Sequence, residues 1–324
     1  MRSWIQTCLT LLLITFSSVI YADNFSTIKQ LAKKGDVVAQ YVVGIMYQQG
    51  KGAEKNKPIA LNWYIKSAKQ NYILAQYSLI AMYQHGDGIE QNLQQAQYWY
   101  AETSKARNLA VLNKQQQSLK QIMSLLQPLA VNNDTNAQYL LASLYANNKQ
   151  ENIANYWFLR GALADDKDAQ YYIGVTYGDK TGFFNTMQAI YWLEKAAKQQ
   201  SLDAQIVLAS LYEQDKEIAA NYEQAAYWYE QAANQGDKAA QSFIAGMYRD
   251  GKGVPVNKQK ALTWYEKAAK QGDAFSQYNL GQMYEMGNGV AYDLNKAIYW
   301  YQQGAKQGHA ASQLKLSALQ GNPQ

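Results

Sequence analysis

The sequence predicts an all-α fold, an α/α superhelix (a solenoid) built from about seven to eight similar helix-turn-helix modules. An Ala-Gln or Ser-Gln dipeptide recurs along the chain, mostly at intervals of 32 to 36 residues, and Tyr and Trp residues recur in step with it. Within each module the apolar residues follow the period of an α-helix rather than the alternation of a strand. Because one helix pair cannot bury its aromatic residues alone, neighbouring modules are expected to stack.

The composition narrows the possible classes of function. The chain has 324 residues, with 30 Lys and Arg, 25 Asp and Glu, a net charge of +5, two His and one Cys. The small number of His and Cys residues argues against a His- or Cys-ligated metal centre and against a thiol catalyst. We therefore expect no metal and no cofactor. The net charge is small and the Lys and Arg are scattered, so we expect no nucleic-acid partner.

Residues 1–22 have the layout of a secretory signal peptide. Arg2 precedes an uncharged, Leu-rich run from Ile5 to Ile20, and the small residue Ala22 follows. This pattern predicts cleavage near Ala22. The alternative is an uncleaved anchor, but the run is short for a hydrocarbon core of ~30 Å. We therefore expect a periplasmic or secreted protein with no membrane span after cleavage and, since Cys8 is removed, no disulfide.

Each module reads as two helices. In the first, the anchor Ala or Ser, an apolar residue at offset 4, a small residue at offset 5 and a Tyr at offset 8 share one face. The small residue, Gly44 in the first module, predicts close approach of another helix. In the second, an Ala lies three residues before a Trp, and we expect these Trp to form the core rather than a surface that stacks on sugars. The mature chain has seven such residues: Trp63, Trp99, Trp157, Trp192, Trp228, Trp264 and Trp300.

The two halves of a module are joined by a Gly-x-Gly loop in several copies, and its glycines supply backbone angles that other residues resist.

Residues 111–136 align with the second half of a module and are expected to be a degenerate repeat, in which Pro128 kinks or stops the helix. The predicted organisation is an N-terminal capping helix at 23–38, repeats one and two at 39–110, the degenerate repeat at 111–136, repeats four to eight at 137–311, and a C-terminal capping helix and tail at 312–324.

Strings such as AQSFIAGMYRDGKGVPVNKQKALTWYEKAAKQGD resemble the Sel-one-like repeat, a relative of the tetratricopeptide repeat. The resemblance covers essentially residues 24–319. It implies a helical scaffold or adaptor without enzymatic activity. Bacterial members are often secreted and are linked to envelope assembly, signalling and host contact, so the resemblance also implies a protein or peptide partner in the cell envelope.

In tetratricopeptide-like solenoids the first helix lines a concave groove, which places offsets 2, 6 and 9 of each module there. Tyr recurs at offset 2, and Tyr combines a large contact area with a hydroxyl at low entropic cost. The alternative is that these tyrosines only pack between neighbouring first helices. The predicted partner-binding residues are Tyr41, Tyr77, Tyr139, Tyr171, Tyr278, Arg249, Gln282 and Glu285.

Three other functions stay open: an immunity or inhibitor protein against a toxic envelope enzyme, direct binding of peptidoglycan or another glycan, and a cell-wall enzyme acting on β-lactams or peptidoglycan. The enzyme hypothesis rests on three short motifs, Ser26-x-x-Lys29, Tyr145-Ala-Asn147 and Lys180-Thr-Gly182. These motifs fall on a capping helix and two loops, without the strand edge that normally presents Lys-Thr-Gly, so we expect no enzymatic activity.

The remaining polar candidates are expected to lie at the surface. Asp165, Asp166 and Asp168 are predicted to form a solvated turn rather than a cation site, because the other oxygen ligands of a calcium loop are missing. His85 and His309 lack a Ser or Asp partner at fixed spacing and are predicted to have no catalytic role.

Overall fold

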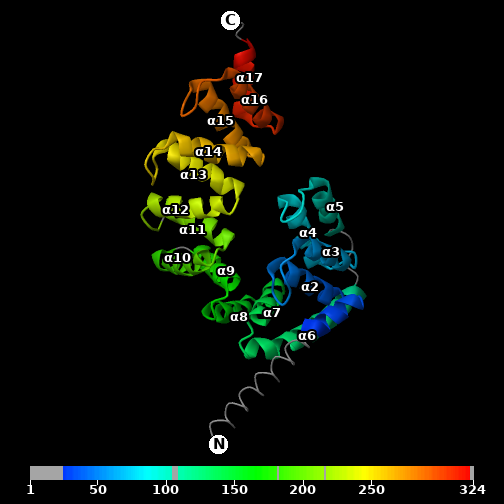
Figure 1. Ribbon diagram of the computed structural model, residues 1–324. Coiled ribbons are helices and arrows are strands. Elements are labelled where there is room, and N and C mark those ends of the chain that lie inside the picture. Colours follow the sequence, from blue (N-terminus) through cyan, green and yellow to red (C-terminus); the bar gives the residue numbers. More distant parts are fainter. Residues whose placement is uncertain (1–24, 104–108, 181, 215–216, 322–324) are drawn as a thin grey trace, which may run out of the picture. The chain divides into compact units, whose positions relative to one another are not determined.

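The computed structural model describes residues 25–103, 109–180, 182–214 and 217–321, and within them it contains helices and no strand (Figure 1). The prediction of an all-α fold is confirmed. The chain divides into two compact units, unit 1 (Met1–Ala169) and unit 2 (Gln170–Gln324). The predicted signal peptide at residues 1–22 lies outside the described residues.

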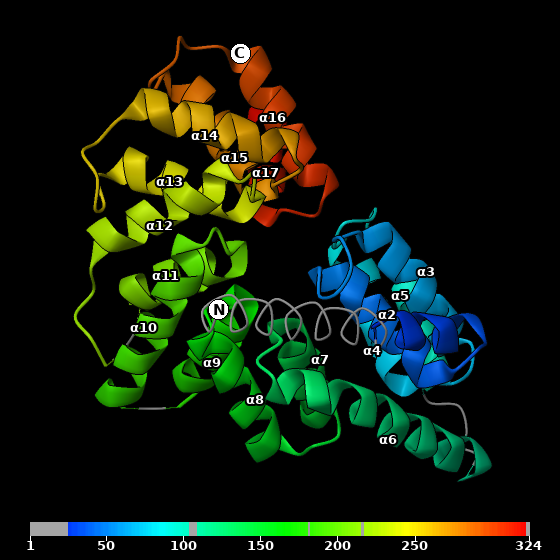
Figure 2. The ribbon, with the colours of Figure 1, turned by 60° about the horizontal axis from the view of Figure 1, so that its bottom comes forward.

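In unit 1 the helices form pairs, and one long helix separates the second pair from the third along the chain (Figure 2). Residues 25–33 form a helix that precedes the first pair. The helices that follow are α2 (Val37–Gln49), α3 (Lys57–Ala68), α4 (Ile73–His85), α5 (Leu93–Thr103), α6 (Leu109–Val131), α7 (Thr135–Asn147) and α8 (Glu151–Leu163). We call α2/α3, α4/α5 and α7/α8 pairs 1, 2 and 3.

Unit 2 continues the same pattern up to a single final helix. Pair 4 begins with α9, which starts just before the boundary of the unit. The helices are α9 (Lys167–Gly178), α10 (Phe183–Lys198), α11 (Leu202–Gln214), α12 (Tyr222–Asn234), α13 (Lys238–Asp250), α14 (Lys258–Lys270), α15 (Ala274–Met286), α16 (Leu294–Lys306) and α17 (Ala310–Gly321). Pairs 4 to 7 are α9/α10, α11/α12, α13/α14 and α15/α16.

Short polar residues start most helices. Asp237, three residues before the anchor alanine of pair 6, accepts a hydrogen bond from the backbone N–H of Ala240, and Asn257 caps the second helix through Lys260. Such caps satisfy N–H groups that have no partner inside the helix. Gly251 and Gly253 flank the loop between the two helices with φ of 71° and 74°, as the Gly-x-Gly pattern predicts.

The predicted tryptophans form the core. Five of the seven, in pairs 2 to 6, are 4–7% exposed, while Trp63 and Trp300 are partly exposed. In pairs 1, 4 and 7 the residue after the Trp lies against the glycine of the first helix of the same pair. A methyl group added at Gly281 would overlap the ring of Tyr301, and one added at Gly44 would overlap the ring of Tyr64. The small residue therefore admits the second helix of its own pair.

A buried glutamine follows the anchor residue and joins consecutive pairs. In pair 6, the amide of Gln241 donates to the backbone carbonyl of Ala233 (3.2 Å), near the end of the preceding second helix, and accepts from Gln271 (2.9 Å), at the end of its own second helix. The same two bonds are made by Gln40, Gln205 and Gln277. We call this series the glutamine ladder.

The joint between pairs 2 and 3 differs from the prediction. Residues 109–131 form one continuous helix, α6, and Pro128 lies inside it. The predicted stop at Pro128 is wrong: the helix continues to Val131, and the burial of Leu126, Leu129 and Ala130 anchors its last turns. In unit 1, α6 contacts both α2 and α7, so pair 1 lies beside pair 3 within this unit (Figure 1).

We predict that Gly281→Ala destabilises unit 2 by about 1–3 kcal/mol, because the added methyl group overpacks the contact with Tyr301. Gly246→Ala is the matched control, since its Cβ would meet the Tyr265 hydroxyl at an ordinary 3.5 Å. Urea unfolding of the two variants tests this. Equal stability of both variants and the parent chain would show that the small residue is not required for packing.

Candidate interaction surfaces

The eight predicted partner-binding residues differ in their exposure. Tyr77 on α4 is 52% exposed, and Tyr41 on α2 is 6% exposed. The other six are half-buried: Tyr139 on α7, Tyr171 on α9, Arg249 on α13, and Tyr278, Gln282 and Glu285 on α15. Of the eight predicted binding residues, Tyr77 is therefore the most accessible to a partner, and Tyr41 is not at the surface.

Tyr41 is buried among residues of pairs 1, 2 and 3. Its ring packs against Tyr64 and Tyr72, with centroids 5.7 and 5.2 Å away, and its hydroxyl accepts a hydrogen bond from Asn147 on α7 (3.1 Å). Burial raises the pKa of Tyr41 to about 12. In this structure Tyr41 packs between helices, which is the alternative that the sequence left open for the offset-2 tyrosines.

The polar residues at offset 9 bond to the second helix of their own pair. Gln48 accepts from the hydroxyl of Tyr64 (2.7 Å), and Glu213 accepts from Tyr229 (3.3 Å). Glu285 likewise accepts from Tyr301 and also from Lys315 on α17 (3.0 Å). Burial alone would raise the pKa of Glu285, but these hydrogen bonds and the charge of Lys315 outweigh it and lower the pKa.

Arg249 and Gln282 line one cavity on the first-helix side of unit 2. It has a volume of about 240 Å³ and lies between α13, α15 and the loop after α15, with Asn279, Met283, Met286 and Asn288 as its other walls. The guanidinium of Arg249 makes two hydrogen bonds of 2.7 Å to Asp250, which lowers the pKa of that carboxyl. The structure thus brings two predicted residues to the same concavity.

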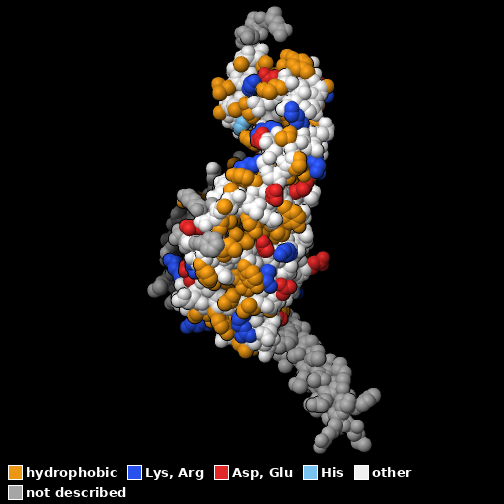
Figure 3. Space-filling view, turned by 90° about the vertical axis from the view of Figure 1, so that its left-hand side faces the viewer, with side chains coloured by type: hydrophobic (Ala, Val, Ile, Leu, Met, Phe, Trp, Pro, Cys, Tyr) orange, Lys and Arg blue, Asp and Glu red, His pale blue; other side chains and the backbone are white. Residues whose placement is uncertain are grey.

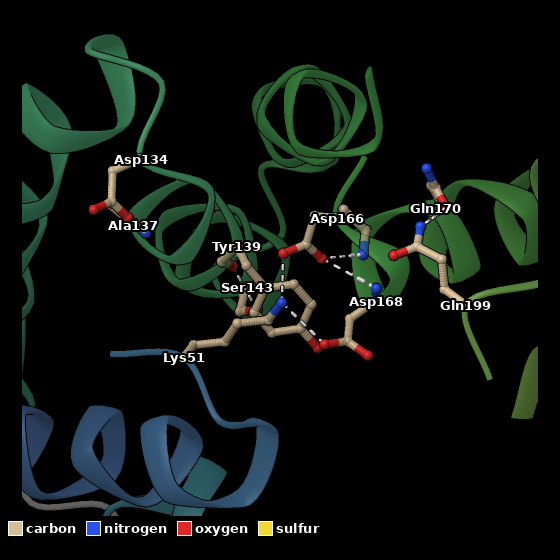
Figure 4. A network of polar contacts seen from close by, with 10 residues as sticks. Lys51, Asp134, Ala137, Tyr139, Ser143, Asp166, Asp168, Gln170 and Gln199 are labelled. Carbon is tan, nitrogen blue, oxygen red and sulfur yellow. Dashed lines mark hydrogen bonds and ion pairs between the residues drawn. The ribbon is translucent and has the colours of Figure 1, made fainter. Parts of the chain in front are cut away.

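A buried ion cluster joins pair 1 to the turn after pair 3 (Figure 4). The ammonium of Lys51, in the loop after α2, contacts Asp166 and lies 2.9 Å from Asp168, and it lies 5.0 Å from the ring centroid of Tyr139. The side chains of Lys51 and Asp166 are 8% and 5% exposed. Asp166 also accepts from the backbone N–H of Ala169 and so caps α9.

The prediction that Asp165, Asp166 and Asp168 form a solvated turn is wrong for Asp166. Its carboxylate is buried because the chain supplies a cation from a segment more than a hundred residues earlier, and the backbone of α9 supplies hydrogen-bond donors. Lys51 also covers one side of Tyr139, so this predicted binding residue is partly occupied by the chain itself. No local pattern in the sequence indicates this pairing.

Sequence reasoning missed a row of exposed tyrosines on the second helices. In five pairs the residue before the buried Trp is a Tyr that is 51–54% exposed, and its ring lies edge-on to that Trp at 4.8–5.1 Å between centroids. Asn62 and Thr263 take this place in pairs 1 and 6, so the fold does not require Tyr there. The five residues are Tyr98, Tyr156, Tyr191, Tyr227 and Tyr299.

Charged residues of both signs mix with apolar ones on the face drawn in Figure 3. This face shows no stripe of Lys and Arg. Within the described part of the chain no helix combines the length and apolar character needed to cross a bilayer. The same residues contain no group of three or more His, Cys, Asp or Glu placed to hold a metal ion.

Three residues of the short motifs, Lys29, Asn147 and Lys180, and one of the two histidines have structural partners. Lys29 donates to the carbonyl of Gly52 (3.3 Å) and Asn147 donates to Tyr41. Lys180 lies 5.4 Å from the ring centroid of Tyr177. His309 does have a Ser partner, contrary to the prediction: its Nδ1 lies 2.9 Å from the Ser312 hydroxyl and accepts from the Ser312 backbone N–H (3.3 Å), at the start of α17. His85 is exposed at the end of α4.

We predict that Lys51→Met destabilises unit 1 by about 3 kcal/mol or more, because it leaves two partly or fully buried carboxylates without their cation. Faster hydrogen exchange in α2 and at the start of α9 measures this. The control is Lys57→Met, which removes a more exposed ion pair between Lys57 of pair 1 and Asp87 of pair 2. It should lower the free energy of unfolding by about 1 kcal/mol or less. If both variants behave alike, the cluster does not hold pair 1 to pair 3.

Comparison with solved structures supports the fold. The chain is 28% identical to a protective antigen of uropathogenic Escherichia coli strains with an SLR fold, over 92% of this chain and 67% of that one, with a TM-score of 0.51. A Sel1 repeat protein from Oxalobacter formigenes is 25% identical, over 91% of this chain and 79% of that one, with a TM-score of 0.47. An immunity protein from Pseudomonas aeruginosa is 15% identical, over 85% and 83%, with a TM-score of 0.31, which is too distant to bear on function. A search of curated proteins found no match.

The Sel1 repeat family matches seven segments of the chain, at residues 37–72, 73–107, 135–166, 167–201, 202–237, 238–273 and 274–309. Each segment begins at or next to the first helix of a pair and contains both of its helices. No match falls on 108–134, where α6 lies. Sel1 repeat proteins are generally scaffolds without enzymatic activity that mediate protein interactions. The chain belongs to the Sel1 repeat family.

Proposed function

We propose that this protein is a non-enzymatic scaffold of the cell envelope that binds a protein or peptide partner on the first-helix side of unit 2. The observation that supports this most directly is the cavity of about 240 Å³ that Arg249 and Gln282 line together. Both residues were predicted from their offsets in the repeat. The cavity walls combine amide side chains with methionines, a set that suits a polypeptide better than a sugar or an ion.

The location in the envelope rests on the sequence of residues 1–22. A basic residue, an apolar run and a small residue in that order are typical of a secretory signal peptide. The mass of the protein isolated from cells tests this proposal, since cleavage after Ala22 leaves a chain that begins at Asp23. A mass that includes residues 1–22 would contradict the proposed cleavage.

Site-specific photo-crosslinking in living cells tests the binding surface. A benzophenone amino acid at Met286, which is 64% exposed beside the cavity, is expected to form an adduct with a partner. The same amino acid at Gln302, an exposed position on the second helix α16, is the matched control and is expected to give none. Adducts from Gln302 but not from Met286 would place the partner elsewhere and contradict the proposal.

A further inference from the structure

The residue between the two loop glycines bonds to the preceding helix pair at two places in the chain. In unit 1, Gln48 on α2 donates to Asp87, in the loop after α4 (3.4 Å). In unit 2, Lys252, in the loop after α13, donates to Glu213 on α11 (2.8 Å). In both cases the partner is the offset-9 residue of the preceding pair. This contact is therefore a recurring link between neighbouring repeats.

The link is replaced by the cavity between pairs 6 and 7. The corresponding residues are Asn288 and Arg249, and they line the cavity without a hydrogen bond between their side chains among the described contacts. Arg249 bonds instead to its neighbour Asp250 and to Asn279 on α15. The offset-9 residue is bonded to the loop of the next pair at two other places, and between pairs 6 and 7 a cavity lies at the same position.

The polar groups of this cavity match a peptide backbone. The amide of Asn288 carries a donor and an acceptor, and the amide oxygen of Gln282 is available because only its nitrogen is used, in a bond to the Tyr278 hydroxyl (2.9 Å). Arg249 is the one charged residue in the walls, and Asp250 already neutralises it with two bonds. The cavity therefore has no charge that would favour an acidic ligand.

The apolar walls fit one bulky side chain. Met283 is 3% exposed and forms the base, while Met286 is 64% exposed at the rim. Methionine is flexible and adapts to side chains of different shape. The volume of about 240 Å³ exceeds that of an engineered cavity of roughly 150 Å³ that holds benzene. A leucine, methionine or phenylalanine side chain can therefore enter.

We propose that this cavity binds an extended, uncharged peptide segment of the partner. One bulky apolar side chain inserts between Met283 and Met286, and the backbone beside it bonds to Asn288, Gln282 and the guanidinium of Arg249. This names the ligand of the surface on which the proposed function rests, and it assigns recognition to the gap between pairs 6 and 7 rather than to the offset-2 tyrosines.

The variant Asn288→Asp separates binding from folding. It places a carboxylate opposite Arg249, which imitates the link between Lys252 and Glu213 with the charges exchanged, so the fold is expected to remain at least as stable. The new ion pair takes the N–H groups that the peptide needs. Met286→Ala removes the apolar rim and tests the second half of the site. Gln302→Ala, on α16, is the control.

Random dodecamer peptides displayed on phage are selected against the full chain, and the affinity of the selected peptides is measured by fluorescence anisotropy. We expect a shared bulky apolar residue with uncharged neighbours. Affinity should fall about tenfold or more for Asn288→Asp and Met286→Ala, as expected when a central contact is lost, and stay unchanged for Gln302→Ala. Thermal unfolding should show Asn288→Asp no less stable than the parent.

Three outcomes would overturn the proposal: no peptide selected, a consensus that depends on acidic residues, or peptides that bind Asn288→Asp as well as the parent chain. In each case the crosslinking result at Met286 stands on its own. An adduct at Met286 together with any of these outcomes would keep the scaffold function and reject the extended apolar peptide as its ligand.

Discussion

The stacking of this chain depends on a buried glutamine that bonds in two directions. Its N–H group donates to a carbonyl at the end of the preceding second helix, which also accepts from a backbone N–H of the turn that follows. Its oxygen accepts from the glutamine that ends its own pair. A buried amide needs both bonds, because an unpaired polar group in the interior is costly. Aromatic packing gives each pair its core, and the glutamine fixes how the next pair is placed on it.

The glutamine ladder has a gap at the end of pair 3, and the ion cluster lies at that gap. Ala164 is the residue that ends α8, where glutamines end the second helices of pairs 4 to 7. The amide oxygen of Gln138 is consequently buried without a partner. Lys51 contacts the acidic turn that follows at once, at Asp166 and Asp168. Unit 1 thus holds this turn with charge at the point where the amide link is missing.

The parts of the fold that follow a period were predictable from the sequence. The Trp positions, the small residue and the loop glycines recur at fixed offsets, and the structure places them as expected. A Tyr follows the Trp in five of the seven pairs, and that repetition could have identified the partner of the offset-9 residues. A polar residue at offset 9 can therefore be present to bond to the Tyr hydroxyl within its own pair, and not only to bind a partner.

Contacts that do not repeat could not be predicted in this way. The bond from Asn147 to Tyr41 and the pairing of Lys51 with Asp166 depend on pair 1 lying beside pair 3 within unit 1, where α6 contacts the first helix of each pair. The sequence predicts a helix that is kinked or stopped at Pro128, because proline removes a helical hydrogen bond, and the helix does not stop there. The candidate cavity likewise arises from a combination, Arg249 with Asn288, in which neither residue is unusual by itself.

The unfolding free energy of Gln241→Met tests the role of the glutamine ladder most directly. Methionine keeps the length of the side chain and removes both hydrogen bonds at a site that is 4% exposed. We predict a loss of about 2–4 kcal/mol in urea unfolding, because both hydrogen bonds of the Gln241 amide are lost at a buried site. Gln313→Met, at an exposed position whose bond is 3.4 Å long, should change stability by less than about 0.5 kcal/mol. Equal stability of the two variants would contradict the claim that the ladder holds the repeats together.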